Sequence, residues 1–77
     1  MLSLHPQVSV RPEPFGALLY HFGTRRLSFL KDRRLLEVVQ RLDGETSVED
    51  ALTGIAEADR PALRTALRTL EKTGMLQ

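Results

Sequence analysis

The chain has 77 residues, of which 42% are hydrophobic and 27% charged, and its formal net charge is +1. This balance is typical of a folded globular protein, and at this length we expect one domain over residues 1–77. The near-neutral charge argues against general electrostatic attraction to nucleic acid or to an anionic membrane.

The chain has no cysteine, which excludes disulfides and thiolate metal sites. No apolar run approaches the ~20 residues of a membrane-spanning helix, and the first residues lack the pattern of a secretory signal. We therefore expect a soluble protein of the reducing cytoplasm.

Short segments with strand character occupy the first third of the chain, where proline and glycine are concentrated. We expect strands over about residues 7–11, 17–22 and 25–30. The first alternates polar and apolar residues, and the second is apolar throughout. Pro14 and Gly16 suit a tight turn after the first strand. Gly23-Thr24 suits a two-residue turn after the second, with glycine taking the positive φ.

The apolar spacing then becomes helical, and we expect helices over about residues 32–42, 47–56 and 59–73. Asp32 can cap the first helix, which Asp43-Gly44 would end. Thr46 or Ser47 opens the second, and Thr46 with Glu49 fits a capping box.

The third helix would begin at Asp59, with Pro61 in the first turn, where proline costs little. Gly74 would stop it, so that Met75-Leu76 folds back onto the core. The predicted fold class is α+β, a three-stranded antiparallel sheet followed by three helices, similar to a winged helix-turn-helix.

Candidate catalytic and metal-binding residues are few. His5 and His21 are far apart in the sequence, and we interpret both as structural. No histidine pair has ligand spacing, and the glycines form no phosphate-binding loop. The sequence therefore predicts no metal site, no cofactor and no enzyme.

The edge of the predicted sheet is the first candidate binding surface. Pro6 and Pro12 flank or interrupt the first strand, whereas the strand over residues 25–30 contains no proline. With Leu27 and Phe29 on one face, that strand can accept an extended peptide as an added strand. The alternative is an edge protected by its own arginines and by its shortness.

Basic residues on the third helix are the second candidate surface. Arg60, Arg64 and Arg68 are four residues apart and share one helix face. They can be a solvated face, with Arg68 paired to Glu71, or the wall of a groove beside the strand edge that suits an acidic peptide.

Several segments resemble the family of mycofactocin-system peptide chaperones, MftB. They are Leu4-His5-Pro6-Gln7-Val8, Arg11-Pro12-Glu13-Pro14-Phe15-Gly16-Ala17 and Tyr20-His21-Phe22-Gly23-Thr24-Arg25-Arg26-Leu27. The helical half is similar to the broader PqqD-like family of RiPP recognition elements, through Leu42-Asp43-Gly44, Ser47-Val48, Ala66-Leu67 and Gly74-Met75-Leu76.

The resemblance implies a winged helix-turn-helix fold that binds no DNA. It implies that the leader of a ribosomally made precursor peptide, similar to MftA, is added as a strand, and that a radical SAM maturase similar to MftC is the partner enzyme. The maturase would bring the iron–sulfur chemistry. The binding residues implied are Arg26, Leu27, Ser28 and Phe29 on the strand and Leu63, Arg64, Leu67, Arg68 and Glu71 on the helix.

Two other functions fit the same residues. A winged-helix DNA-binding protein would use the three arginines, although Glu57, Asp59 and Glu71 dilute their charge. A structural module would pair the exposed strand with a second copy of the chain.

Overall fold

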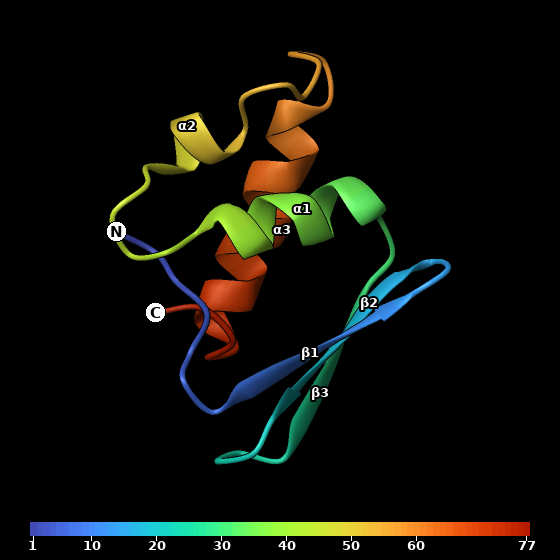
Figure 1. Cartoon of the computed structure of the whole chain (residues 1–77), viewed down its shortest axis with the longest axis vertical. Coiled ribbons are helices and arrows are strands. Elements are labelled where there is room, and N and C mark those ends of the chain that lie inside the picture. Colours follow the sequence, from blue (N-terminus) through green and yellow to red (C-terminus); the bar gives the residue numbers. More distant parts are fainter.

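The computed structural model describes all 77 residues as a three-stranded sheet with three helices gathered on one side of it (Figure 1). The elements are β1 (Val8–Glu13), β2 (Gly16–His21), β3 (Arg26–Leu30), α1 (Arg33–Arg41), α2 (Val48–Ala51) and α3 (Arg60–Lys72). The predicted α+β class, an antiparallel sheet followed by three helices, is confirmed. The likeness to a winged helix stays a prediction.

The sheet has the order β1-β2-β3, and both pairs of strands are antiparallel. The central strand is apolar on both faces. Ala17, Leu19 and His21 are buried on the inner face towards the helices, while Leu18 and Tyr20 lie half-buried on the outer face. Period-two alternation therefore sets which side chains reach the core.

The turn between β2 and β3 differs from the prediction. It spans residues 22–25, and the residue with positive φ is Arg25 (φ 59°), not Gly23. His21 organises this turn: its Nδ1 accepts the backbone N–H of Gly23 at 3.0 Å and of Thr24 at 3.1 Å. The predicted two-residue turn is wrong. The observed loop is longer, and the buried imidazole of His21 accepts hydrogen bonds from its backbone N–H groups.

The two histidines come together in the fold. The rings of His5 and His21 lie 4.4 Å apart between centroids, and His21 is only 4% exposed. Both accept backbone N–H groups through Nδ1, from Gln7 in the case of His5. This arrangement supports the structural interpretation of these residues.

The first and third helices begin where the sequence predicts. Asp32 caps α1 by accepting the backbone N–H of Arg34 at 2.8 Å. The Arg34 guanidinium also donates to Asp32 and, at 2.7 Å, to Asp59 at the start of α3. The hydrogen bond from Arg34 lowers the pKa of the Asp32 carboxyl below its ordinary value. Pro61 lies in the first turn of α3, as expected.

The second helix is shorter than the predicted span of 47–56. Ser47 caps it by accepting the backbone N–H of Asp50, so Thr46 forms no capping box with Glu49. The helix ends after Ala51, and the Arg41 guanidinium donates to the carbonyls of Ala51 and Thr53 beyond its last turn. Gly54 follows at φ +92°.

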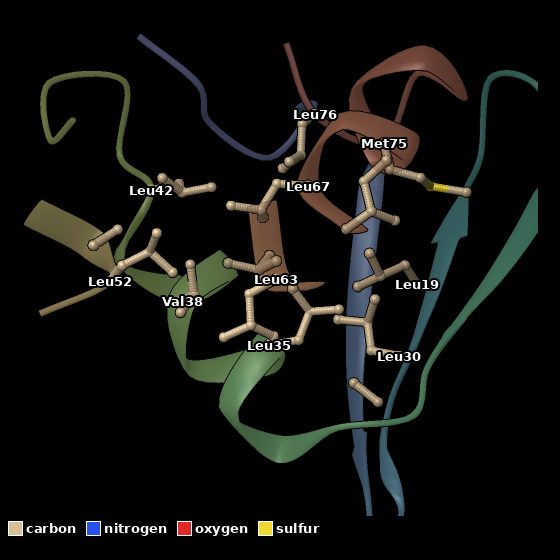
Figure 2. Packing of buried hydrophobic residues seen from close by; sticks show 14 of the residues in the cluster. Leu19, Leu30, Leu35, Val38, Leu42, Leu52, Leu63, Leu67, Met75 and Leu76 are labelled. Atoms are coloured by element: carbon tan, nitrogen blue, oxygen red, sulfur yellow. The ribbon is translucent and has the colours of Figure 1, made fainter. Parts of the chain in front are cut away.

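One hydrophobic cluster joins the sheet to the helices (Figure 2). Its fifteen members are Ala17, Leu19, Leu30, Leu35, Val38, Val39, Leu42, Ala51, Leu52, Ile55, Leu63, Leu67, Leu70, Met75 and Leu76. Met75 and Leu76 fold back onto the core, as predicted. The chain ends also pair, since the backbones of Ser3 and Gln77 exchange two 2.9 Å hydrogen bonds. Sequence patterns gave no sign of that pairing.

Alanine substitutions at Gly16 and Gly54 would test how closely the backbones of β2 and β3 approach each other at Gly16. A Cβ at Gly16 (φ +151°) would overlap the carbonyl oxygen of Leu30, whereas a Cβ at Gly54 would meet nothing within 4 Å. Gly54→Ala should cost about 1 kcal/mol for its positive φ. Gly16→Ala should cost about 2–4 kcal/mol, because overpacking adds to backbone strain. Chemical unfolding followed by circular dichroism measures both, and equal costs would contradict the close approach.

Candidate functional site

The outer edge of β3 is unoccupied in the folded chain. β3 pairs with β2 alone, and no backbone hydrogen bond joins Leu27–Leu30 to any other segment. In an antiparallel strand, alternate N–H and C=O groups face away from the paired neighbour. β3 therefore presents free donors and acceptors along a strand without proline.

A hollow of about 370 Å³ lies beside this edge, between β3 and α3, and we name it the β3–α3 hollow. Its lining residues are Ser28, Phe29, Leu30, Leu35, Ala66, Thr69, Leu70 and Thr73. Most of this lining is apolar, and the hydroxyls of Thr69 and Thr73 donate back to carbonyls of α3. A free strand edge thus borders an apolar hollow.

The four strand residues singled out from the sequence all lie along this edge. Ser28 is half-buried and lines the hollow, while Leu27 and Phe29 are 52% and 58% exposed on the outer face. Arg26 is exposed at the start of β3. Side chains of an added strand would alternate in the same way, one into the hollow and the next onto the outer face.

The five helix residues lie elsewhere on α3. Leu63 and Leu67 are buried in the core. Arg64, Leu67, Arg68 and Glu71 line a second hollow of about 270 Å³, the α2–α3 hollow, together with Leu2 and Val48. The structure therefore does not bring these helix residues to the β3–α3 hollow, and their role in binding stays a prediction.

Sequence reasoning missed the side of α3 that does line the β3–α3 hollow. Ala66, Thr69, Leu70 and Thr73 recur at helical spacing and form one continuous stripe. Small side chains at 66, 69 and 73 leave room beside the strand. This run of alanine and threonine was the available signal, but only the packing of α3 shows which side of the helix faces β3.

Two of the three arginines on α3 are engaged within the chain. Arg64 binds Glu49 of α2 through two hydrogen bonds of 2.9 and 2.8 Å, and Arg60 donates to the carbonyl of Ile55 at 3.0 Å. The hydrogen bond from Arg64 lowers the pKa of Glu49, and the same contact raises the pKa of Arg64. Arg68 forms no ion pair, with Glu71 or otherwise, so it is the free cation of this stripe.

The described residues show no group of three or more histidine, aspartate or glutamate side chains placed to hold a metal ion. None of the helices is both long enough and apolar enough to cross a membrane.

The whole chain, residues 1–77, matches the peptide chaperone MftB family. The chain belongs to that family. It is 53% identical over 75 residues to the peptide chaperone MftB of Mycobacterium tuberculosis, covering 95% of this chain and 69% of the relative. It is 52% identical to the peptide chaperone MftB of Mycolicibacterium smegmatis over 95% of this chain and 74% of the relative. No solved structure matches the chain.

The ion pair between Glu49 and Arg64 makes a testable electrostatic prediction. Its stabilising effect should be fully present above pH ~4.3, the ordinary glutamate pKa, and be lost as the pH falls through the lowered pKa of the folded protein. In NMR titrations of the side-chain carboxyl, Arg64→Gln should raise the pKa of Glu49. Arg68→Gln is the matched control and should leave it unchanged. Equal titration curves for wild type and Arg64→Gln would contradict the pairing.

Proposed function

We propose that this MftB-family chain binds the leader of a ribosomally made precursor peptide by strand addition along β3, and presents it to a radical SAM maturase in mycofactocin biosynthesis. The observation that carries the proposal is the free edge of β3 beside the apolar β3–α3 hollow. Family membership supports the role of peptide chaperone.

Backbone hydrogen bonds along β3 would position the leader but would not distinguish one leader sequence from another. An added strand lies about 4.8 Å from its neighbour, so its inward side chains would enter the β3–α3 hollow. Leu30, Leu35 and Leu70 line that hollow with aliphatic surface. The leader is therefore expected to carry apolar residues at every second position over the paired stretch.

An extended leader loses conformational freedom when it binds, and apolar burial in the hollow offsets that cost. Once the leader is held, the remainder of the precursor stays tethered near the enzyme at a raised effective concentration. The chain itself contributes binding and orientation, and the maturase contributes the chemistry.

The competing function, DNA binding by α3, loses support from the contacts of the arginines. Arg60 and Arg64 are held by Ile55 and Glu49, which leaves Arg68 as the free cation of the stripe. A DNA-contacting helix needs several cations free to meet phosphates.

Thr69 and Thr65 give a matched pair for testing the hollow. Both are exposed, and both hydroxyls donate to the carbonyl four residues earlier, but only Thr69 lines the β3–α3 hollow. Thr69→Arg should weaken leader binding at least tenfold, about 1.4 kcal/mol, because the long charged side chain obstructs the hollow. Thr65→Arg should stay within about twofold of wild type, about 0.4 kcal/mol, because residue 65 lies outside the hollow.

Fluorescence anisotropy of a labelled leader peptide from the same biosynthetic system measures both affinities, and circular dichroism checks the fold. If Thr69→Arg binds the leader as tightly as Thr65→Arg does, the hollow is not the site. Failure of the wild-type chain to bind the leader would refute the proposed function itself.

Arg68 tests whether the basic residues of α3 also contribute. If the leader is acidic, Arg68→Glu should lower affinity and flatten its dependence on salt, because a free cation is lost. Arg64→Glu should have the smaller effect on binding, since Arg64 already pairs with Glu49. Lys72→Glu, an exposed charge reversal on the same helix, is the control. A salt dependence shared by wild type and Arg68→Glu would exclude Arg68 from the site.

A further inference from the structure

The face of the sheet turned away from the helices is unusually apolar. We name it the outer sheet face, formed by Phe15, Leu18, Tyr20, Phe22, Leu27 and Phe29. Phe22 is 62% exposed and Phe15 is 47% exposed. Neither the core nor the β3–α3 hollow accounts for these side chains as a group.

The outer sheet face is organised by contacts between its own rings. Tyr20 and Phe22 meet edge to face with centroids 5.0 Å apart, and Phe15 lies 6.4 Å from Phe29. Across the strands, Tyr20 is directly opposite Leu27 in the register. These pairs hold a continuous apolar surface over β2 and β3.

The exposed apolar side chains on this face add up to the size of a typical functional patch. Phe15, Phe22, Leu27 and Phe29 are each about half exposed, which amounts to roughly 100 Å² a side chain and about 400 Å² together. Patches of this size on soluble proteins often mark sites where a partner docks.

Cations surround the outer sheet face. Arg11 lies on the same face of β1, Arg25 is in the turn after β2, and Lys31 follows β3 at an outward-facing position, all three exposed. The acidic residue of this face is Glu13, which already pairs with Arg11 at 2.9 Å. The rim of the apolar surface is therefore basic.

This charge distribution distinguishes between two possible occupants of the outer sheet face, a second copy of the chain and a different protein. In a twofold dimer the same patch meets itself, so the basic rims of two copies would face one another. A second copy is thus disfavoured, whereas a protein with an apolar centre and an acidic rim is complementary.

We propose that the outer sheet face docks the maturase, through an apolar surface of that enzyme with an acidic rim. The choice of the maturase rests on the proposed function. A leader added to β3 would lie at the border of this face, beside Leu27 and Phe29. The bound leader and the docked enzyme would then be neighbours on opposite sides of one strand edge, so that the tethered precursor emerges next to the enzyme.

A double variant, Phe22→Ser with Arg25→Glu, tests the proposal. Both residues lie at the end of the outer sheet face farthest from Phe15, and neither lines the β3–α3 hollow, so leader binding should not be affected directly. Biolayer interferometry would measure binding of the purified maturase of the same system, and anisotropy would measure the labelled leader. The expected result is at least a tenfold loss of affinity for the maturase, with leader affinity unchanged. Thr65→Arg, on the exposed side of α3, should leave both affinities unchanged.

A second variant, Arg25→Glu with Lys31→Glu, keeps the apolar centre intact and guards against loss of folding in the first. It should weaken maturase binding most at low salt. Unchanged maturase affinity in both folded variants, or no binding of the maturase to the wild-type chain, would overturn the proposal. The proposal would also be overturned if sedimentation showed that the wild-type chain is a dimer and that Phe22→Ser dissociates it, because a second copy would then occupy the outer sheet face. Failure of the leader to bind the wild-type chain would instead refute the proposed function, and a selective loss of maturase binding would still support this docking face.

Discussion

The packing of α1 against both the sheet and α3 is the constraint on which the two proposed binding surfaces depend. Leu35, Val38 and Val39 of α1 are buried, and α1 contacts β2, β3, α2 and α3. The three helices lie together on one side of the sheet (Figure 1), and a hollow remains between β3 and α3. The space left beside β3 has Leu35 in its lining, so core packing itself creates the hollow.

The distribution of charge complements this arrangement. The cations on the helical side are largely engaged within the chain, because Arg34, Arg41, Arg60 and Arg64 each donate to a carboxylate or a carbonyl. At the outer face of the sheet, Arg11 pairs with Glu13, while Arg25 and Lys31 form no ion pair. A chain of net charge +1 can therefore present an apolar hollow on one side of β3 and a basic-rimmed apolar face on the other. Under the proposals above, such separation would let the leader and the maturase bind without competing for one surface.

The sequence by itself determined the features that depend on neighbouring residues. Period-two alternation placed the first strand, apolar composition placed the second, and helical spacing placed α1 and α3. Asp32 and Pro61 marked where those two helices begin, since capping and ring geometry act over a few residues. The free edge of β3 was also predicted, because the third strand contains no proline and short turns favour pairing of consecutive strands.

Only the tertiary structure decided which residues meet across long stretches of chain. Arg41 donates to the carbonyls of Ala51 and Thr53 at the end of α2. His21 lies against His5 with its ring tilted, and it accepts backbone N–H groups of the turn that follows β2. The rotation of α3, which turns Thr69 rather than Arg68 towards β3, goes with the burial of Leu63, Leu67 and Leu70 in the common core. Local patterns define the stripes of a helix, but the free energy of burying one stripe against a particular neighbour depends on the whole core.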